Sequence, residues 1–438
     1  MLTVKGLLLQ RSKKVEDELS VQPLEKPGYP KPSALRCFIR SNDGQSLLVP
    51  RFSPPAQTLD TVDDRRPKPE DVQISFNGIL RPLQVEAMDA TMGLLRGCGG
   101  SVLSLAPGQG KTACAFYAMA QLKVKTLVIV HKQILLEQWR ERARHFVGQD
   151  IGRIQQNVFE DANIVVAMIQ TLCSRDWDAR AFSKFGLLVV DEAHHVPANV
   201  FSRAMFLLCP KYTLGLTATP DRADGCERAL FWFLGPQSFI SVRKCDPGTA
   251  CYTALYIKEY DQEDRGLPTR WDGTLNQSQY ITDIAVDETR NREIANAIQS
   301  ILSKDRGRKM IILTDRKYQA DLLRLFLKDH GARIYYGGMK QEELSEAAKG
   351  KVIIATYGIA SEGLDIPDVD TVVLASPRSD VRQAIGRAMR DGTVSRSHST
   401  LIVDVVDTWG SVAQAMFRKR KNIYEAQCLE YFFFESKY

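Results

Sequence analysis

Short apolar runs alternate with longer amphipathic segments along most of this 438-residue chain, and this alternation restricts its fold more than any other feature. The apolar runs have the length of buried strands, whereas a segment such as 134–146 has the charged face of a helix. Strands that alternate with helices favour a doubly wound parallel sheet. The runs predicted as strands in the first half of the chain are 101–105, 126–130, 164–168, 187–190 and 213–216.

The same alternation returns after about residue 290. A strand is predicted at 309–313, and a helix follows from Lys317 until Gly331 ends it. Further apolar runs that predict strands are 332–336, 352–355, 371–374 and 401–405. We therefore predict an α/β fold with two parallel-sheet domains, 77–235 and 290–438, joined by a connector over 236–289.

The region before the first predicted domain has a different character. Nine of the 19 prolines lie in residues 1–69, and proline disfavours long helices there. Residues 37–40 and 46–49 flank Asn42-Asp43-Gly44, a turn sequence typical of a hairpin. We predict a small β-rich accessory module over residues 1–76.

The composition excludes several protein classes. Hydrophobic residues make up 44% and charged residues 25% of the chain, as in folded globular proteins, which excludes a disordered or collagen-like chain. No stretch approaches the roughly 20 apolar residues of a membrane span, so no membrane partner is expected. The nine cysteines include no CxxC pair, which favours reduced thiols and an intracellular location.

The net charge of 58 − 52 = +6 is unevenly distributed. Residues 1–69 carry 12 basic and 8 acidic side chains (+4), and residues 376–421 carry 9 and 4 (+5), so the rest of the chain carries 6 − 9 = −3. Two basic regions allow a polyanionic partner such as nucleic acid. We expect residues 1–69, with their net charge of +4, to assist the binding of nucleic acid.

The segment Leu105–Thr112, LAPGQGKT, has the context of a phosphate-binding loop, because it follows a predicted strand and begins a predicted helix. Gly108 and Gly110 allow backbone N–H groups to approach phosphate oxygens. Lys111 can reach the β- and γ-phosphates, and the Thr112 hydroxyl can bind Mg²⁺. The residues expected to hold the nucleotide phosphates are Pro107, Gly108, Gln109, Gly110, Lys111 and Thr112.

Two carboxylates follow the apolar run 187–190, at the strand end where α/β sheets bind ligands. Asp191 can hold Mg²⁺ through water, and Glu192 can orient and deprotonate the attacking water. An acidic pair alone is often a surface turn. About 80 residues after a phosphate loop, the pair indicates an enzyme that hydrolyses ATP with Mg²⁺.

Three ordered motifs carry a family resemblance: Asp191-Glu192-Ala193-His194, the segment 216–220 (LTATP) and the segment 383–390 (QAIGRAMR). The ordered motif set covers residues 81–390. In this order of motifs, the chain resembles the superfamily 2 helicases. DEAHHV at 191–196 and GLTATPDRADG at 215–225 are most similar to the XPB and phage UvsW branch. The segment 48–52 resembles helicases of large nucleocytoplasmic DNA viruses, including the poxvirus transcript-release helicase.

The resemblance implies two tandem RecA-like domains and assigns further roles. Gln84 would read the adenine of ATP, Arg81 would help to bind the nucleotide, and Gly363 and Asp365 would contact the nucleotide from the second domain. Residues that would couple ATP hydrolysis to strand movement are His194, Thr217 and Thr219. Residues that would stabilise the transferring phosphoryl group are Gln383, Arg387 and Arg390.

The resemblance also implies nucleic-acid contacts at the other edge of the sheets, which would be sequence-independent and salt-sensitive. The candidates are His131, Lys132, Gln170, Thr171, Asp315, Arg316 and Thr356. It further implies 3′–5′ movement, DNA rather than RNA as substrate, a monomer, transcription or replication machinery as partners, and location in an infected cell or virion.

Two alternatives remain open at this stage. The chain could be a translocase that releases transcripts or migrates branched DNA without processive unwinding. It could also be mainly a binding subunit of a transcription or replication assembly. A binding subunit would not need Glu192 together with Arg387 and Arg390, so the presence of these residues argues against the second alternative.

Overall fold

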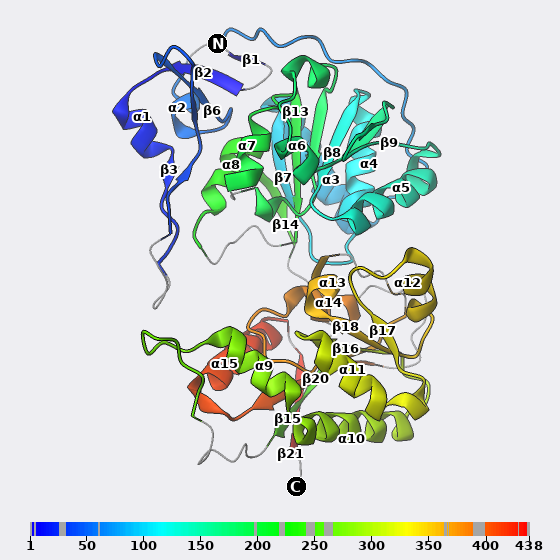
Figure 1. Cartoon of the computed structure of the whole chain (residues 1–438). Coiled ribbons are helices and arrows are strands. Elements are labelled where there is room, and N and C mark those ends of the chain that lie inside the picture. Colours follow the sequence, from blue (N-terminus) through cyan, green and yellow to red (C-terminus); the bar gives the residue numbers. More distant parts are fainter. Residues whose placement is uncertain are drawn as a thin grey trace. The chain divides into compact units, whose positions relative to one another are not determined.

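The computed structural model divides the chain into two compact units, residues 1–242 and 243–438 (Figure 1). The structure describes all residues except 1, 4–5, 26–31, 60–61, 197–198, 219–223, 242–249, 258–265, 363–365, 367, 389–398, 428 and 436–438. Each unit contains its own sheet and its own apolar core.

The first unit is built on an eight-stranded sheet in which only the edge strand β10 runs antiparallel to its neighbour. The order is β10-β9-β11-β8-β12-β13-β7-β14. Every strand predicted in this half of the chain is confirmed. The strands are β7 (Gly100–Ser104), β8 (Thr126–Val130), β9 (Gly152–Gln155), β10 (Val158–Phe159), β11 (Ile164–Met168), β12 (Leu187–Val190), β13 (Tyr212–Thr217) and β14 (Gln237–Ile240).

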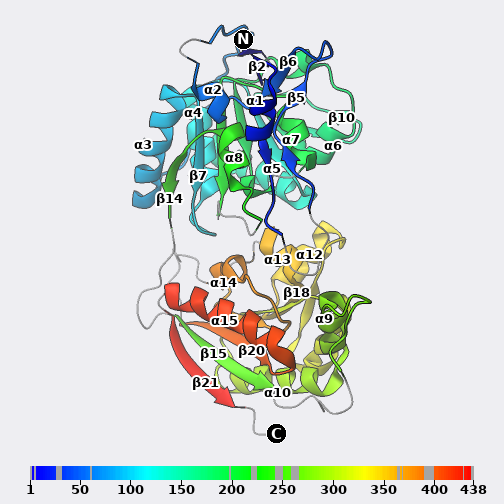
Figure 2. The same cartoon turned by 90° about the vertical axis from the view of Figure 1, so that its left-hand side faces the viewer.

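Helices cover both faces of this sheet because consecutive strand residues point to opposite faces. In β8, Val128 packs with one set of helices and Leu127 and Ile129 pack with the other. The first set is α3 (Pro82–Gly97), α4 (Lys111–Leu122) and α5 (Gln133–Val147). The second set is α6 (Ile169–Cys173), α7 (Asn199–Met205) and α8 (Glu227–Leu234). The doubly wound arrangement is visible in Figures 1 and 2.

The predicted N-terminal β-rich module is present. Its larger sheet has the order β1-β2-β6-β5, and the predicted hairpin is confirmed, since Ile39 of β5 pairs antiparallel with Leu48 of β6 and Gly44 has a φ of 68° in the turn. The elements are β1 (Leu2–Thr3), β2 (Gly6–Gln10), α1 (Lys13–Glu18), β3 (Ser20–Val21), β4 (Leu35–Arg36), β5 (Ile39–Arg40), β6 (Ser46–Val49) and α2 (Pro54–Gln57). The module is joined to the first unit, because its buried Leu19 and Leu47 share one apolar cluster with Phe206 and Trp232.

The second unit contains a seven-stranded, wholly parallel sheet in the order β17-β18-β16-β19-β20-β15-β21. The strands are β15 (Ala250–Ile257), β16 (Met310–Thr314), β17 (Arg333–Tyr335), β18 (Val352–Thr356), β19 (Thr371–Leu374), β20 (Thr400–Asp407) and β21 (Glu430–Glu435). The helices are α9 (Gln277–Val286), α10 (Glu288–Lys304), α11 (Lys317–Phe326), α12 (Gln341–Ala348), α13 (Tyr357–Glu362), α14 (Arg382–Ala388) and α15 (Gly410–Ala426). All strands predicted after residue 290 are present. The helix predicted from Lys317 ends at Phe326, and a short 3₁₀ turn, Lys328–His330, leads to Gly331.

The segment 236–289 differs from the connector predicted for it. It contributes β14 to the first sheet, β15 to the second and helix α9. β15 lies between β20 and β21, whose residues follow it by about 150 positions or more. Because both partners of β15 are so distant in the sequence, its role as an inner strand depends on long-range pairing and has no local signal.

The α/β fold class is thus confirmed, with two parallel-sheet units and a small β-rich module. Within the described ranges, no helix combines the length and the apolar character that crossing a membrane would require.

Candidate nucleotide and nucleic-acid sites

The predicted phosphate loop joins the carboxyl end of β7 to the first residue of α4. Gly108 and Gly110 adopt φ angles of 81° and 86°, in the left-handed region that suits glycine. Gly110 is also the residue that precedes α4, so the helix N-terminus opens directly out of the loop. This arrangement provides the backbone donors and the helix dipole that an anion site needs.

Arg81 and Gln84, at the start of α3, lie against this loop. The Gln84 amide donates to the Gln109 carbonyl at 2.8 Å, and the Arg81 guanidinium donates to the Gly108 carbonyl at 3.2 Å. Within the loop, the Gln109 side-chain oxygen accepts from the Ala106 N–H at 2.8 Å. Two residues predicted to bind the nucleotide therefore also hold the loop in shape.

The Lys111 ammonium group donates to the Leu105 carbonyl at 3.0 Å. The Lys111 side chain therefore reaches back from the start of α4 to the first residue of the loop. Pro107 is in the same turn. A lysine cation beside such a loop is suited to phosphate oxygens.

Two side chains of α5 contact the two residues predicted to bind metal. The Trp139 indole N–H donates to Asp191 Oδ2 at 2.9 Å, and Arg142 donates to the Thr112 hydroxyl at 2.8 Å. Thr112 and Asp191 are buried, with 9% and 8% of their surface exposed. One hydroxyl and one carboxylate oxygen are a donor set that fits Mg²⁺, which takes few protein ligands besides phosphates and water.

Neither Trp139 nor Arg142 is predicted from the motifs. A sequence signal does exist, because the two residues are three positions apart and share a helix face. Trp139 is 1% exposed, and a buried indole N–H requires an acceptor. Which acceptor it reaches is visible only in the folded chain.

Glu192 lies where the carboxyl ends of β12 and β13 meet, with a backbone φ of 49°. Its carboxylate is 3.4 Å from His194 Nδ1, and this nitrogen is 3.2 Å from the Thr217 hydroxyl. The structure therefore brings together three predicted residues, one catalytic and two coupling. Thr219 lies outside the described residues.

Three imidazole rings lie in contact, tilted against one another, beside these carboxylates. The ring centroids of His194 and His195 are 4.3 Å apart, and those of His195 and His131 are 4.5 Å apart. Burial, together with the neighbouring Lys132 charge, lowers the pKa of His131, although Glu192 and Asp191 oppose this shift. The neutral ring of His131 is thus favoured at physiological pH.

Some of the residues predicted to contact nucleic acid in the first unit lie close together. Gln170, after β11, donates from its side chain to the His131 carbonyl at 2.8 Å, so these two residues are neighbours. Burial lowers the pKa of Lys132. The Thr171 hydroxyl accepts from the Gln156 N–H at 3.0 Å and is buried, which gives it a structural role in this state.

In the second unit, Asp315 and Arg316 follow β16 and form an ion pair. The Arg316 guanidinium also donates to the Thr282 hydroxyl at 3.1 Å and to the Ser278 carbonyl at 3.0 Å, both on α9. Thr356 ends the adjacent strand β18, at the same edge of the sheet. These three predicted contacts therefore lie at one edge.

The predicted nucleotide contacts of the second unit are described only in part. Gln383 lies half-buried on α14, and Arg387 belongs to the same helix. Gly363, Asp365 and Arg390 lie outside the described residues.

Two family models match the chain. One is described as "Type III restriction enzyme, res subunit" and matches residues 77–222, and the other is "Helicase conserved C-terminal domain", matching residues 293–392.

Two curated relatives have helicase or translocase names. The chain is 28% identical over 433 residues to L396 of Acanthamoeba polyphaga mimivirus, which is named an ATP-dependent RNA helicase, and the match covers 95% of this chain and 82% of that protein. It is 26% identical over 387 residues to "DNA 3'-5' translocase XPB2" of Sulfurisphaera tokodaii, covering 78% of this chain and 84% of that one.

A solved structure supports the same architecture. The structure titled "S. cerevisiae Dbp5 bound to RNA and ADP BeF3" aligns with a TM-score of 0.55 at 16% identity, over 81% of this chain and 90% of that chain. At this identity the likeness shows the fold, which is that of tandem RecA-like helicases.

Proposed function

Since this chain is a superfamily 2 helicase similar to viral helicases and to XPB-type translocases, we propose that its ATP- and Mg²⁺-dependent motor acts on DNA in the 3′–5′ direction. The observation that carries the proposal is the grouping of Lys111, Asp191 and Glu192 at one edge of the first sheet. There, His194 and Thr217 link the Glu192 carboxylate to the next strand.

In this mechanism, Lys111 and the loop N–H groups bind the phosphates of ATP, and Thr112 and Asp191 hold Mg²⁺, which when bound offsets charge on the phosphate oxygens. Trp139 orients the Asp191 carboxylate. Glu192 orients the attacking water and accepts its proton. We propose that Gln383, Arg387 and Arg390 stabilise the transferring phosphoryl group, on the basis of their motif.

The choice of DNA rests on the XPB2 relative, whose name specifies DNA and the 3′–5′ direction. The name of L396 specifies RNA instead. The decisive measurement is ATP hydrolysis with single-stranded DNA, duplex, forked DNA, RNA and a DNA–RNA hybrid. We expect the DNA substrates to stimulate hydrolysis most. Stimulation by RNA alone would contradict the choice of DNA and leave the motor intact.

The motor itself is tested by Glu192→Gln, which keeps the shape of the side chain and removes the base. We expect nucleic-acid-stimulated hydrolysis to fall about 10²- to 10⁴-fold while nucleotide binding persists. Glu86→Gln, at an exposed position on α3, is the matched control and keeps wild-type activity. Equal hydrolysis by Glu192→Gln and wild type, unaffected by nucleic acid, would refute the motor.

A translocase without processive unwinding is the second candidate, favoured by the word "translocase" in the name of the XPB2 relative. Strand displacement on the best activating substrate separates the two. Hydrolysis without displacement of a paired strand supports the translocase, whereas displacement supports the helicase.

A further inference from the structure

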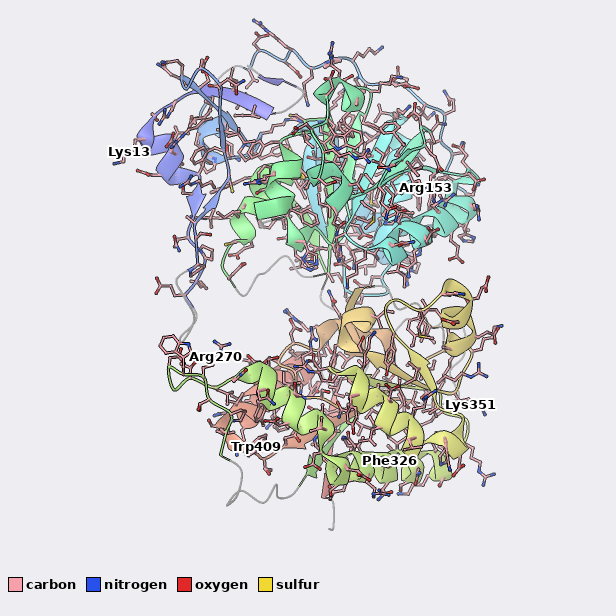
Figure 3. All side chains as sticks on the ribbon, viewed as in Figure 1. Lys13, Arg153, Arg270, Phe326, Lys351 and Trp409 are labelled. Carbon is pink, nitrogen blue, oxygen red and sulfur yellow. The ribbon has the colours of Figure 1, made fainter. Side chains whose placement is uncertain are left out.

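Trp271 is 98% exposed, the highest value for a large apolar side chain in the described part of the chain. It lies at the tip of a short hairpin, residues 266–276, that precedes α9 and carries the Arg270 label in Figure 3. Exposing an indole to water is unfavourable, and tryptophan is highly buried on average. A tip occupied by tryptophan therefore suggests a contact made in another state.

The hairpin has a defined conformation. The Arg270 N–H donates to the Thr274 carbonyl at 2.7 Å, and Gly273 returns an N–H to the Arg270 carbonyl at 3.0 Å with a φ of 76°. The Asp272 carboxylate accepts from the Thr274 N–H at 2.9 Å and from its hydroxyl at 2.6 Å. Because these bonds hold the turn, the backbone that carries the exposed indole has a fixed shape.

The base of the hairpin is anchored in the second unit. Leu275 packs on the cluster of Tyr280 and Trp409, whose rings stack with centroids 5.0 Å apart. The Tyr280 hydroxyl donates to the Trp409 carbonyl at 2.7 Å. Leu267, on the other arm, lies against Gly410, where an added Cβ would be 3.0 Å from it.

The anchor leads directly to the predicted nucleic-acid edge. α9 begins two residues after Leu275, and its Ser278 and Thr282 bind the guanidinium of Arg316. The hairpin that carries Trp271 is therefore joined, through the start of α9, to the edge formed by Asp315, Arg316 and Thr356.

We propose that Trp271 is a base-stacking contact for an unpaired nucleotide of the bound strand. An indole face stacks on any base, so such a contact suits a motor that moves along a strand without reading its sequence. The adjacent Arg270 offers a guanidinium to a backbone phosphate, and Asp272 of the same turn partly offsets its charge. This proposal rests on the proposed function, because it needs a bound strand.

The variants are Trp271→Ala, which removes the ring, and Trp271→Phe, which keeps a smaller one. Leu325→Ala, 61% exposed on α11, is the matched control for loss of exposed apolar surface. Each full-length protein is titrated with a labelled oligothymidine and an oligouridine of equal length. Binding is read by fluorescence anisotropy, and ATP hydrolysis is measured with and without the oligonucleotides.

We expect Trp271→Ala to weaken oligonucleotide binding about 5- to 100-fold, with Trp271→Phe in between and Leu325→Ala unchanged. Hydrolysis without nucleic acid stays at the wild-type rate in all four proteins. Acrylamide quenches the Trp271 emission in the free protein, and the oligonucleotide protects it. Trp139, Trp232 and Trp409 contribute little to this quenching, since each is less than 10% exposed, and the contribution of the half-buried Trp177 is measured in Trp271→Ala and subtracted.

Unchanged affinity of Trp271→Ala, or unchanged acrylamide quenching on binding, would overturn the proposal. The motor would then still be supported if the wild type binds the oligonucleotide and is stimulated by it. Failure of the wild type to bind or respond to either oligonucleotide would instead contradict the proposed function.

Discussion

Single residues at the candidate ATP site are positioned by side chains outside the motifs. The Asp191 carboxylate receives one hydrogen bond from the Trp139 indole and one from the Glu192 backbone N–H at 3.0 Å. Both donors fix the direction of its oxygens. Partners of this kind commonly change metal affinity 10- to 100-fold when removed.

Trp139→Phe keeps an aromatic ring in the core and removes only the N–H group. We expect the Mg²⁺ concentration that half-saturates ATP hydrolysis to rise roughly 10-fold, because the Asp191 carboxylate is less well oriented. The maximal rate at high Mg²⁺ falls less. A Mg²⁺ titration of the stimulated ATPase measures this, with Trp177→Phe, half-buried near Phe182, as control. An unchanged half-saturation point would show that Trp139 serves only packing.

At the scale of elements, one buried ion pair joins helix α10 to the end of β20. The Arg290 guanidinium donates to both oxygens of Asp407, at 2.6 and 3.0 Å, and their side chains are 1% and 0% exposed. Asp287 accepts from the Arg290 N–H at 2.8 Å and caps the same helix. The buried ion pair of Arg290 and Asp407 therefore helps to attach α10 to the sheet.

Arg290→Met leaves the Asp407 carboxylate buried without its cation. We expect the second unit to lose about 3–5 kcal/mol of unfolding free energy. The double variant Arg290→Met/Asp407→Leu should recover much of this loss, since it removes both charges. Urea unfolding followed by far-UV circular dichroism measures the shift. Arg292→Met is the control, because its pair with Glu288 is more than half exposed and is worth roughly 0–1 kcal/mol. Equal effects of the two single variants would contradict this account.

On the scale of the molecule, the N-terminal module is part of the first unit's core. The Phe52 N–H donates to the Trp232 carbonyl at 3.0 Å. The Arg51 guanidinium donates to the carbonyls of Lys211 at 2.9 Å and Cys98 at 2.8 Å. Deleting the module would expose the apolar side of α8, so a deletion would confuse loss of binding with loss of folding.

The predicted role of the module in nucleic-acid binding is therefore better tested through its surface charge. Lys13 and Lys14 are exposed on α1. We expect Lys13→Glu/Lys14→Glu to weaken oligonucleotide binding and to reduce the slope of log affinity against log salt by about 1–2. Lys328→Glu/Lys349→Glu, two exposed positions elsewhere, controls for net charge. An unchanged slope would contradict a role for the module.

Much of the fold follows from local pattern. Apolar runs such as 126–130 and 187–190 specify strands wherever they occur, because a short buried run has few alternatives. The phosphate loop and the Asp191-Glu192 pair are equally local, since both depend on residues adjacent in the sequence. These features predicted two α/β units, an ATPase and the helicase resemblance.

The tertiary structure decided what depends on distant partners. β15 became an inner strand through pairing with β20 and β21, Trp139 found its acceptor 52 residues away, and α9, which follows the hairpin bearing Trp271, contacts Arg316. The reason is physical: a motif records which groups are available, whereas distance, burial and hydrogen-bond direction exist only after the chain has closed its long loops. The sequence alone determined the class of motor, and the folded chain determined which side chains contact the predicted metal ligands and which aromatic side chain is left exposed on the hairpin before α9.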